Sequence, residues 1–369
     1  MSNSYNLQEI NQEKALNLCQ FYIRAGQNML MVGPKGIGKT HLSIQSALKC
    51  GFKLSYVNLS VLERPDLAGF PILNDNSDVI NFKSPHYLPP LKEGQKPDIV
   101  ILFDEIDKCS SDLWAPLLEI LQFRTINGKK INCVACILTG NLMSESKSYS
   151  NEISGPLLDR CSKYILSFDF NVWLKWAQES VLHPLVLGFL SSNQDAVIGA
   201  PEATEWAVPT PRGWEFVSKA LIRAGELKIT DIDTITSIVA GFVGENAAIR
   251  FSEWYSYSRH LEKFLIPLIE NGFCNIEYHK LEPTEQLVFA IMACYLAKNK
   301  VLEKKGKKRL KHLEHLCNFF LNEKVAPEVQ LLAMSNAFSF DLIVKEKLYE
   351  CDLFLKMHKE LTDSANEIK

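Results

Sequence analysis

A glycine-rich segment, Gly33–Thr40, has the pattern G-x-x-x-x-G-K-T of a phosphate-binding loop. Such a loop surrounds the β-phosphate of a nucleotide with backbone N–H groups at the start of a helix. Lys39 would neutralise the β- and γ-phosphates, and the Thr40 hydroxyl would ligate Mg²⁺. Glycine is expected here because a Cβ would block the close approach of phosphate oxygens. We expect nucleotide contacts from the loop and the next residue: Gly33, Pro34, Lys35, Gly36, Ile37, Gly38, Lys39, Thr40 and His41.

Two adjacent carboxylates follow a continuous apolar run further along the chain. Ile99–Phe103 has the character of a strand buried on both faces of a parallel sheet, and Asp104 and Glu105 come directly after it. Asp104 would hold the Mg²⁺ shell, and Glu105 would polarise the water that attacks the γ-phosphate. Asp107 is interpreted as a helix cap or a surface charge.

The first half of the sequence alternates between short apolar runs and helical patterns, which predicts a doubly wound α/β domain to about residue 170. Asn127-Gly128 predicts a hairpin over residues 124–131, because both residues favour a type I′ turn. Residues 63–94 are rich in Pro, Asn, Asp and Gly and are interpreted as an insertion. The predicted strands are Met29–Val32, Lys53–Leu59, Ile99–Phe103, Cys133–Leu138 and Tyr164–Phe168.

After Asn171 the apolar residues recur at helical spacing. A chain of 369 residues is too long for one ordinary core, so several domains are expected. We predict a nucleotide-binding α/β domain over residues 1–170, an all-helical lid over 171–260 and a helical C-terminal extension over 261–369. The predicted helical stretches are Trp173–Leu190, Trp214–Ala224, Ile232–Phe242, Phe251–Ile269, Thr284–Ala297 and Lys308–Phe320.

Four segments together resemble the Walker A, Walker B, sensor-1 and arginine-finger motifs of AAA+ ATPases: Gly33–Thr40, Ile99–Asp107, Leu138–Asn141 and Leu157–Arg160. The insertion, with its Pro65–Gly69 segment, and the hairpin resemble the helix-2 insert and pre-sensor-1 hairpin of the MoxR-like branch, within the dynein-related grouping. The resemblance covers roughly Leu16–Leu221 and weakens beyond it. It implies an AAA+ P-loop NTPase that binds ATP and Mg²⁺.

The resemblance implies roles for three more polar residues. Asn141 would be the sensor-1 residue that bonds the attacking water or the γ-phosphate, although a turn-forming asparagine is the alternative. Arg160 resembles the finger that enters a neighbouring subunit's site, and a surface arginine in an ion pair is its alternative. Arg212, in Pro211-Arg212-Gly213 before a helix, resembles sensor 2 but could also lie on a loop.

A finger that acts in trans implies a homo-oligomeric ring, and the family resemblance implies a hexamer. MoxR-like relatives are chaperone-like and often act with a von Willebrand factor A domain partner. The resemblance therefore implies a motor that remodels a protein client.

Other functions stay open from the sequence. A nucleic-acid translocase or restriction-type motor could use the same core, and the basic run Lys304–Lys311 could contact phosphates, but a solvated helix junction also explains that run. The acidic pair, Asn141 and Arg160 argue against a small-molecule kinase. A scaffold without turnover is disfavoured, because no catalytic position is visibly lost. The phosphate motif does not decide between ATP and GTP.

The overall composition is that of a globular protein, with 47% hydrophobic and 22% charged residues. A formal net charge of -3 argues against a surface built wholly to hold nucleic acid. Its 10 cysteines lie mostly in apolar runs and no export signal is apparent, so we expect buried, reduced thiols in a cytoplasmic protein. Cys133 and Cys136 are expected on opposite faces of one strand, as core thiols rather than a metal site.

Overall fold

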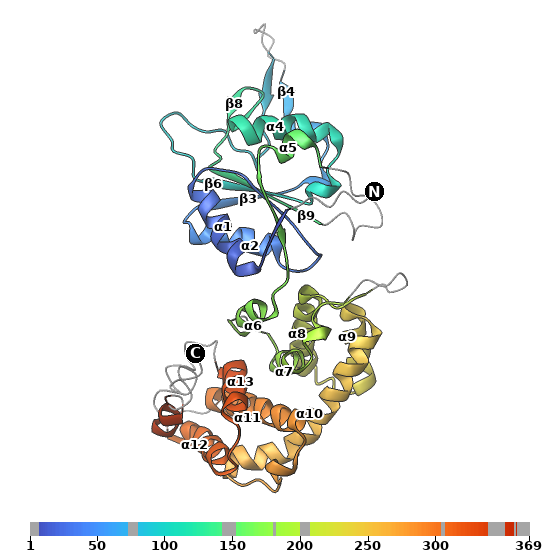
Figure 1. Cartoon of the computed structure of the whole chain (residues 1–369), viewed down its shortest axis with the longest axis vertical. Helices are drawn as coiled ribbons and strands as arrows, with labels where there is room; N and C mark the ends of the chain where they lie inside the picture. The colour runs from blue at the N-terminus through green and yellow to red at the C-terminus, as the bar shows by residue number, and fades with distance from the viewer. Residues whose placement is uncertain are drawn as a thin grey trace. The chain divides into compact units, whose positions relative to one another are not determined.

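The apolar runs of the N-terminal half form one parallel sheet in the computed structural model of this chain (Figure 1). Strand β2 leads through the glycine-rich loop into helix α2 (Lys39–Lys49). Later strands of the chain pair on both sides of β2. This is the α/β fold of a P-loop NTPase, as the sequence predicted. The spatial order of the strands is β1 (Gln8–Ile10), β10 (Ser162–Leu166), β2 (Met29–Val32), β9 (Ala135–Gly140), β6 (Ile99–Asp104) and β3 (Lys53–Asn58).

The structure describes residues 7–72, 80–141, 153–179, 182–199, 207–303, 307–338, 351–357 and 359. The chain divides into two compact units, Met1–Val172 and Trp173–Lys369, and each is described here by itself.

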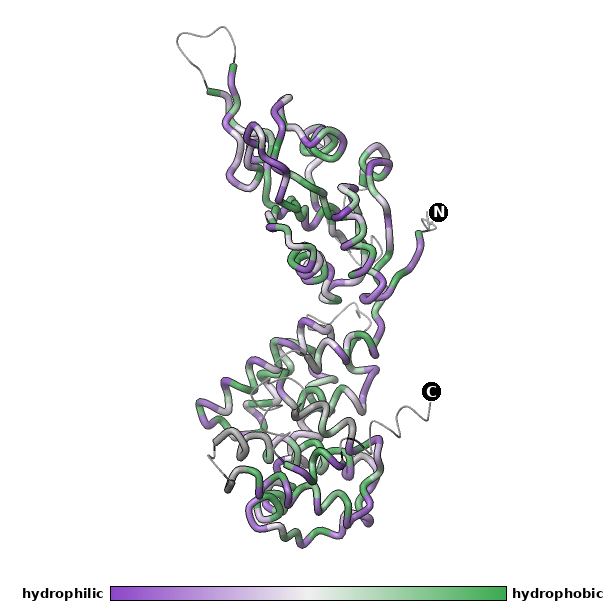
Figure 2. The backbone as a smooth tube through the Cα atoms, turned by 90° about the vertical axis from the view of Figure 1, so that its left-hand side faces the viewer, coloured by the Kyte–Doolittle hydropathy of each residue, from purple (hydrophilic) through white to green (hydrophobic). Residues whose placement is uncertain are grey.

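Helices cover both faces of the sheet in the first unit (Figure 1). Helices α1 (Gln12–Arg24) and α2 lie on one face, and α4 (Trp114–Phe123) and α5 (Gly155–Leu158) lie on the other. Hydrophobic segments run through the interior of this unit (Figure 2). The three central strands β2, β9 and β6 are mainly apolar, and nearly all of their residues are buried. Their burial fixes the carboxyl ends of β2, β6 and β9 side by side, where the candidate residues lie.

Three strands differ from the sequence prediction by more than one residue. Strand β10 runs over Ser162–Leu166, two positions before the predicted bounds Tyr164 and Phe168. The edge strand β1 was missed, because its three residues are mostly polar and pair only with β10. Strand β9 begins at Ala135, two positions after the predicted start at Cys133. The Cys133 N–H bonds to the Ile131 oxygen at 2.9 Å, so Cys133 belongs to the turn before the strand.

The predicted hairpin over residues 124–131 is present as β7 (Thr125–Ile126) and β8 (Lys129–Lys130). Asn127 and Gly128 between them have φ values of 48° and 73°, as a type I′ turn requires. The predicted insertion contains the short helix α3 (Arg64–Ala68) and the antiparallel strands β4 (Phe70–Ile72) and β5 (Asn81–Lys83).

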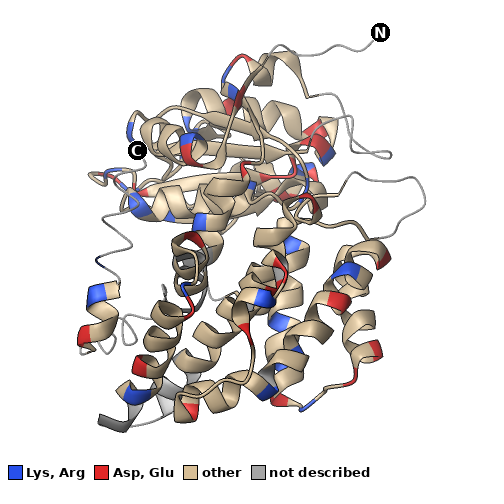
Figure 3. Cartoon of the chain, turned by 60° about the horizontal axis from the view of Figure 1, so that its bottom comes forward, with Lys and Arg blue, Asp and Glu red and all other residues tan. Residues whose placement is uncertain are grey.

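The second unit is helical in its described residues. Its core includes the indole of Trp214, which packs against Phe189 and Phe251 and donates to the Ala196 oxygen at 2.7 Å. Acidic and basic residues are interspersed along the helices (Figure 3). The helices are α6 (Phe170–Glu179, which begins in the first unit), α7 (Pro184–Ser192), α8 (Pro211–Glu226), α9 (Ile232–Val243), α10 (Glu245–Asn271), α11 (Pro283–Glu303), α12 (Lys307–Asn322) and α13 (Pro327–Phe338).

The predicted helix Trp173–Leu190 is two helices, because Pro184 starts α7 and the His183 side chain caps it. Helix α10 runs without interruption through residue 260, where the boundary between lid and extension was expected. The division into three domains stays a prediction. Among the described helices, none combines the length and apolar character needed to cross a bilayer.

Candidate nucleotide-binding site

The loop between β2 and α2 requires glycine at its three glycine positions for different structural reasons. A Cβ on Gly33 would lie 2.6 Å from the backbone oxygen of Leu166 on β10, so Gly33 is required for packing inside the sheet. Gly36 and Gly38 have φ values of 74° and 100°, which side chains disfavour. The expectation that all three glycines serve phosphate access is therefore too simple, because Gly33 is fixed by a neighbouring strand.

The Lys39 ammonium group lies inside the loop that precedes it. Its Nζ donates to the backbone oxygens of Gly33 at 2.7 Å and Pro34 at 2.8 Å, and to Oδ1 of Asn141 at 3.1 Å. Only 8% of Lys39 is exposed. The loop and the end of β9 thus hold one cation between them.

The carboxylate of Asp104 is the centre of a hydrogen-bond network at the end of β6. Its Oδ2 accepts from the Thr40 hydroxyl at 2.9 Å and from the Tyr56 hydroxyl at 3.3 Å. Its Oδ1 accepts from the Thr139 hydroxyl and from the backbone N–H of Glu105 at 3.0 Å. The sequence predicted Asp104 beside Thr40, but it missed Tyr56 and Thr139. A polar Thr139 within the apolar run of β9 was the available signal.

Glu105 has a left-handed backbone conformation, with φ 59° and ψ 42°. This conformation is uncommon for a residue other than glycine or asparagine and costs on the order of 1 kcal/mol. It turns the chain out of β6 directly after Asp104. The Glu105 carboxylate lies 3.0 Å from Lys108 Nζ and is about one-third exposed.

Asp107 is buried, with 1% exposure, and both of its carboxylate oxygens bond to one residue. Oδ1 accepts from the backbone N–H of Asn141 at 3.0 Å, and Oδ2 accepts from Nδ2 of Asn141 at 3.3 Å. The interpretation of Asp107 as a cap or surface charge was therefore wrong. With Nδ2 bonded to Asp107, Oδ1 of Asn141 is left to accept from Lys39.

The residues at these strand ends fit a magnesium–nucleotide complex. A carboxylate and a hydroxyl 2.9 Å apart, Asp104 and Thr40, are the hard oxygen donors that Mg²⁺ takes in phosphate sites. Backbone N–H groups at the start of α2 and the Lys39 ammonium supply positive charge for phosphates. Within the loop, Lys35 and the adjacent His41 are exposed, while Ile37 is buried in the core.

Arg160 and the loop lie at opposite ends of the parallel strands. Arg160 precedes β10, and its backbone oxygen accepts from Nδ2 of Asn28, the residue before β2. Because β2 and β10 are parallel, Arg160 is at their amino ends and Gly33–Thr40 follows the carboxyl end of β2. The four residues of β2 span roughly 13 Å. Arg212 is the exposed second residue of α8 in the other unit, so its position relative to the loop is not described.

The sequence predicted that Cys133 and Cys136 lie on opposite faces of one strand, and this prediction was wrong. Their sulfur atoms are 3.5 Å apart, because Cys133 is in the turn before β9. The hydrogen bond with Cys136 and burial raise the pKa of Cys133 well above its ordinary value. Both are free thiols, and the described residues contain no group of three or more His, Cys, Asp or Glu side chains that could hold a metal.

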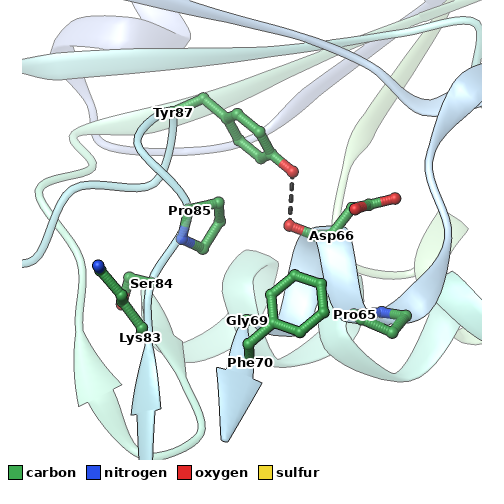
Figure 4. A pocket seen from close by; sticks show the side chains of 8 residues that line it. All are labelled: Pro65, Asp66, Gly69, Phe70, Lys83, Ser84, Pro85 and Tyr87. Carbon is green, nitrogen blue, oxygen red and sulfur yellow. Dashed lines mark hydrogen bonds between the residues drawn. The ribbon is translucent and has the colours of Figure 1, made fainter. Parts of the chain in front are cut away.

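The insertion carries a small pocket near α3 and the antiparallel β4–β5 pair (Figure 4). Its volume is about 250 Å³, and one wall is set by the Tyr87 hydroxyl, which donates to the Asp66 backbone oxygen at 2.5 Å. The insertion is tied to the β7–β8 hairpin, because Asn127 Nδ2 donates to the Ala68 oxygen at 2.5 Å.

No family model matches this sequence, and no curated protein matches it. Solved structures do resemble the chain. The Holliday junction branch migration motor RuvB of Thermotoga maritima has 15% identity over 70% of this chain and 75% of its own, with a TM-score of 0.35. An ATPase candidate from Cytophaga hutchinsonii has 16% identity over 91% and 85%, with a TM-score of 0.34. NtrX of Brucella abortus, in complex with ADP, has 11% identity over 68% and 64%, with a TM-score of 0.34. These values are low, so the functional assignment rests on the residues of this chain.

Proposed function

We propose that this chain is a Mg²⁺-dependent ATPase of the AAA+ kind that remodels a protein partner. The observation that carries the proposal is the convergence of Lys39, Thr40, Asp104 and Asn141 at the ends of three neighbouring strands. Thr40 and Asp104 come from distant parts of the sequence, yet their oxygens are 2.9 Å apart. A structural turn would not need this arrangement of one cation, two oxygen ligands for Mg²⁺ and an amide oxygen beside the cation.

Each residue has a distinct part in the proposed reaction. Lys39 and the loop N–H groups bind and orient the β- and γ-phosphates. Thr40 and Asp104 would hold Mg²⁺, which would neutralise charge on the phosphates when bound. The Glu105 carboxylate accepts a hydrogen bond from the attacking water and polarises its O–H bond, and Asn141 presents Oδ1 as an acceptor beside Lys39. Asp107 fixes that amide orientation.

The proposed active form is a homo-oligomeric ring, with a hexamer as the family resemblance implies. Arg160 and the Gly33–Thr40 loop of the same subunit are at opposite ends of the strands. A role for Arg160 at the γ-phosphate therefore requires the loop of another subunit. A guanidinium in that position would stabilise charge that develops in the transition state. Arg212, on the helical unit, would reach the γ-phosphate of its own subunit.

The insertion and the β7–β8 hairpin are the proposed moving parts. They are linked by Asn127; the insertion comes after β3, and the hairpin comes after β6 and α4. Hydrolysis would change the angle between the two units and displace this linked pair. A MoxR-like role with a von Willebrand factor A partner in the cytoplasm is the specific form that we propose. The interspersed charges favour a protein client over a nucleic-acid backbone (Figure 3).

The test is nucleotide hydrolysis by the purified chain, measured with ATP and GTP in the presence and absence of Mg²⁺. Glu105→Gln should bind ATP but hydrolyse it at least ~10²-fold more slowly. Glu13→Gln, a change at an exposed acid on α1 of the same unit, is the control and should keep the wild-type rate. Wild-type hydrolysis by Glu105→Gln would remove the catalytic assignment. Hydrolysis stimulated by DNA in a salt-dependent manner would favour the nucleic-acid motor instead.

A further inference from the structure

The guanidinium group of Arg160 is held by neutral oxygens of its own subunit. Its Nε and Nη2 donate to Oε1 of Gln122 at 3.0 and 2.6 Å, and its Nη1 donates to the Pro156 backbone oxygen at 2.6 Å. Among the described residues, no carboxylate forms an ion pair with Arg160. The side chain is therefore oriented without loss of its net charge.

Another arginine of the same chain shows the contrasting arrangement. Arg250 donates from Nη1 and Nη2 to the two carboxylate oxygens of Asp195, at 2.7 and 3.1 Å. That pair compensates its own charge, and the hydrogen bonds from Arg250 lower the pKa of Asp195. A fork of this kind is the usual way to hold a structural arginine. Arg160 instead donates from two nitrogens, Nε and Nη2, to the single amide oxygen of Gln122.

The backbones that carry Gln122 and Arg160 are also joined. Nδ2 of the buried Asn28 donates to the Leu121 oxygen at 3.0 Å and to the Arg160 oxygen at 2.9 Å. Helices α4 and α5, which lead to these residues, lie side by side (Figure 1). One buried amide thus fixes the spacing between Gln122 and Arg160, and the Gln122 side chain fixes the direction of the guanidinium.

We propose that Gln122 is a positioning residue, which orients Arg160 for the nucleotide of a neighbouring subunit and leaves its charge uncompensated. This inference rests on the function proposed above. Three N–H groups of Arg160 are used within the subunit, so two of its five donors are left for oxygens of a phosphate. A neutral acceptor is essential, because a carboxylate at position 122 would neutralise the cation before it met the phosphate.

The test compares Gln122→Glu with Gln122→Ala. The first change keeps the shape and both acceptor contacts but adds a compensating negative charge, whereas the second removes the contacts and leaves the charge intact. Because a finger supplied in trans is worth about 10³–10⁵-fold in kcat, partial neutralisation should cost on the order of 10- to 100-fold. Gln122→Ala should cost less, about 3- to 10-fold, because Arg160 can still reach its target from a looser ensemble.

A purely structural role would give the opposite order. An Arg–Glu pair would hold Arg160 at least as well as the amide, so Gln122→Glu would keep activity and Gln122→Ala would be the worse variant. Nucleotide affinity should be unchanged in both variants, which separates this effect on kcat from a damaged binding loop. Gln95→Glu, an exposed glutamine that contacts Lys92, adds the same charge and should match the wild type.

Mixed assemblies then show on which subunit Gln122 acts. Gln122→Glu mixed with Glu105→Gln should regain activity, since some interfaces would pair an intact Glu105 with an intact Gln122 and Arg160 on the neighbour. Native mass spectrometry confirms that the subunits mix. No regain in assemblies that are shown to be mixed would place the Gln122 effect inside its own subunit and overturn the proposal.

The failure of this inference differs from a failure of the proposed function. If the wild type hydrolyses ATP and Arg160→Ala abolishes that activity, but Gln122→Glu is fully active or less impaired than Gln122→Ala, only the positioning role is wrong. If the wild type does not hydrolyse nucleotides, or Arg160→Ala retains full activity, the function proposed above fails first.

Discussion

Asp107 and Asn141 are joined by two hydrogen bonds, from the backbone N–H at 3.0 Å and from Nδ2 at 3.3 Å. The chain is tightly packed at this contact, because a Cβ on Gly140 would lie 3.1 Å from Oδ1 of Asp107. The buried carboxylate therefore sets both the position and the amide orientation of Asn141.

Asp107→Asn should lower kcat about tenfold or more with little change in ATP affinity. An amide at this position can accept only through one oxygen, so one of the two Asn141 donors loses its partner. Stopped-flow or steady-state hydrolysis and a separate nucleotide-binding titration measure the two effects. Asp112→Asn, at an exposed acid nearby in the sequence, is the control. An unchanged kcat in Asp107→Asn would show that the orientation of Asn141 does not matter for the reaction.

Lys39→Ala should abolish nucleotide binding, because the triphosphate loses its main cationic partner in the loop. Lys35→Ala is the matched control, since Lys35 belongs to the same loop but is exposed, whereas Lys39 is buried against the loop oxygens. Titration with a fluorescent ATP analogue distinguishes the two variants. Near-normal affinity in Lys39→Ala would remove the assignment of the phosphate-binding loop.

Glu105→Asn should stabilise the protein while it removes hydrolysis. Asparagine adopts the left-handed conformation of this position more easily than glutamate, so the free energy of unfolding should rise by about 0.5–1 kcal/mol. Glu105→Gln keeps the unfavourable backbone preference and should leave the stability near that of the wild type. Chemical denaturation of the three proteins measures the difference. Equal stability of Asn and Gln variants would show that the backbone of Glu105 is not strained.

The helical unit should lose stability in mild acid through His183. Burial lowers the pKa of this imidazole from 6.5 to about 4, and its neutral Nδ1 accepts from the Leu185 N–H at 3.3 Å at the start of α7. The unfolded chain binds a proton more readily, so the contribution is complete above about pH 6.5 and is lost as the pH falls toward 4. We expect a loss on the order of 1–3 kcal/mol, reduced by the solvent that reaches this partly exposed residue.

Denaturation of the wild type and of His183→Asn between pH 7 and pH 4 checks this prediction. Asparagine is a good N-cap that does not titrate in this range, so the variant should lose less stability over the same interval. An identical pH dependence in both proteins would assign the acid sensitivity to other groups.

The sequence by itself determined the fold class, and it predicted the residues of the candidate site. Gly33–Thr40 and Asp104-Glu105 could be recognised in the sequence because each motif consists of residues close together in the chain, directly after an apolar run that predicts a strand. The hairpin at Asn127-Gly128 was readable for the same reason, since its turn type follows from two neighbouring residues. Signals of this kind do not need the rest of the protein.

Only the tertiary structure decided which distant residues meet. Asp107 was interpreted as a helix cap or a surface charge, and no role was predicted for Thr139 or Gln122, because their partners are distant in the sequence. Packing of parallel strands brings Thr139 to Asp104 and Asn141 to Asp107, and the buried Asn28 brings Gln122 to Arg160. Likewise, the contact between Cys133 and Cys136 depends on a strand start that apolar periodicity cannot locate. These relations arise from three-dimensional packing, whose energy is shared among residues far apart in the chain.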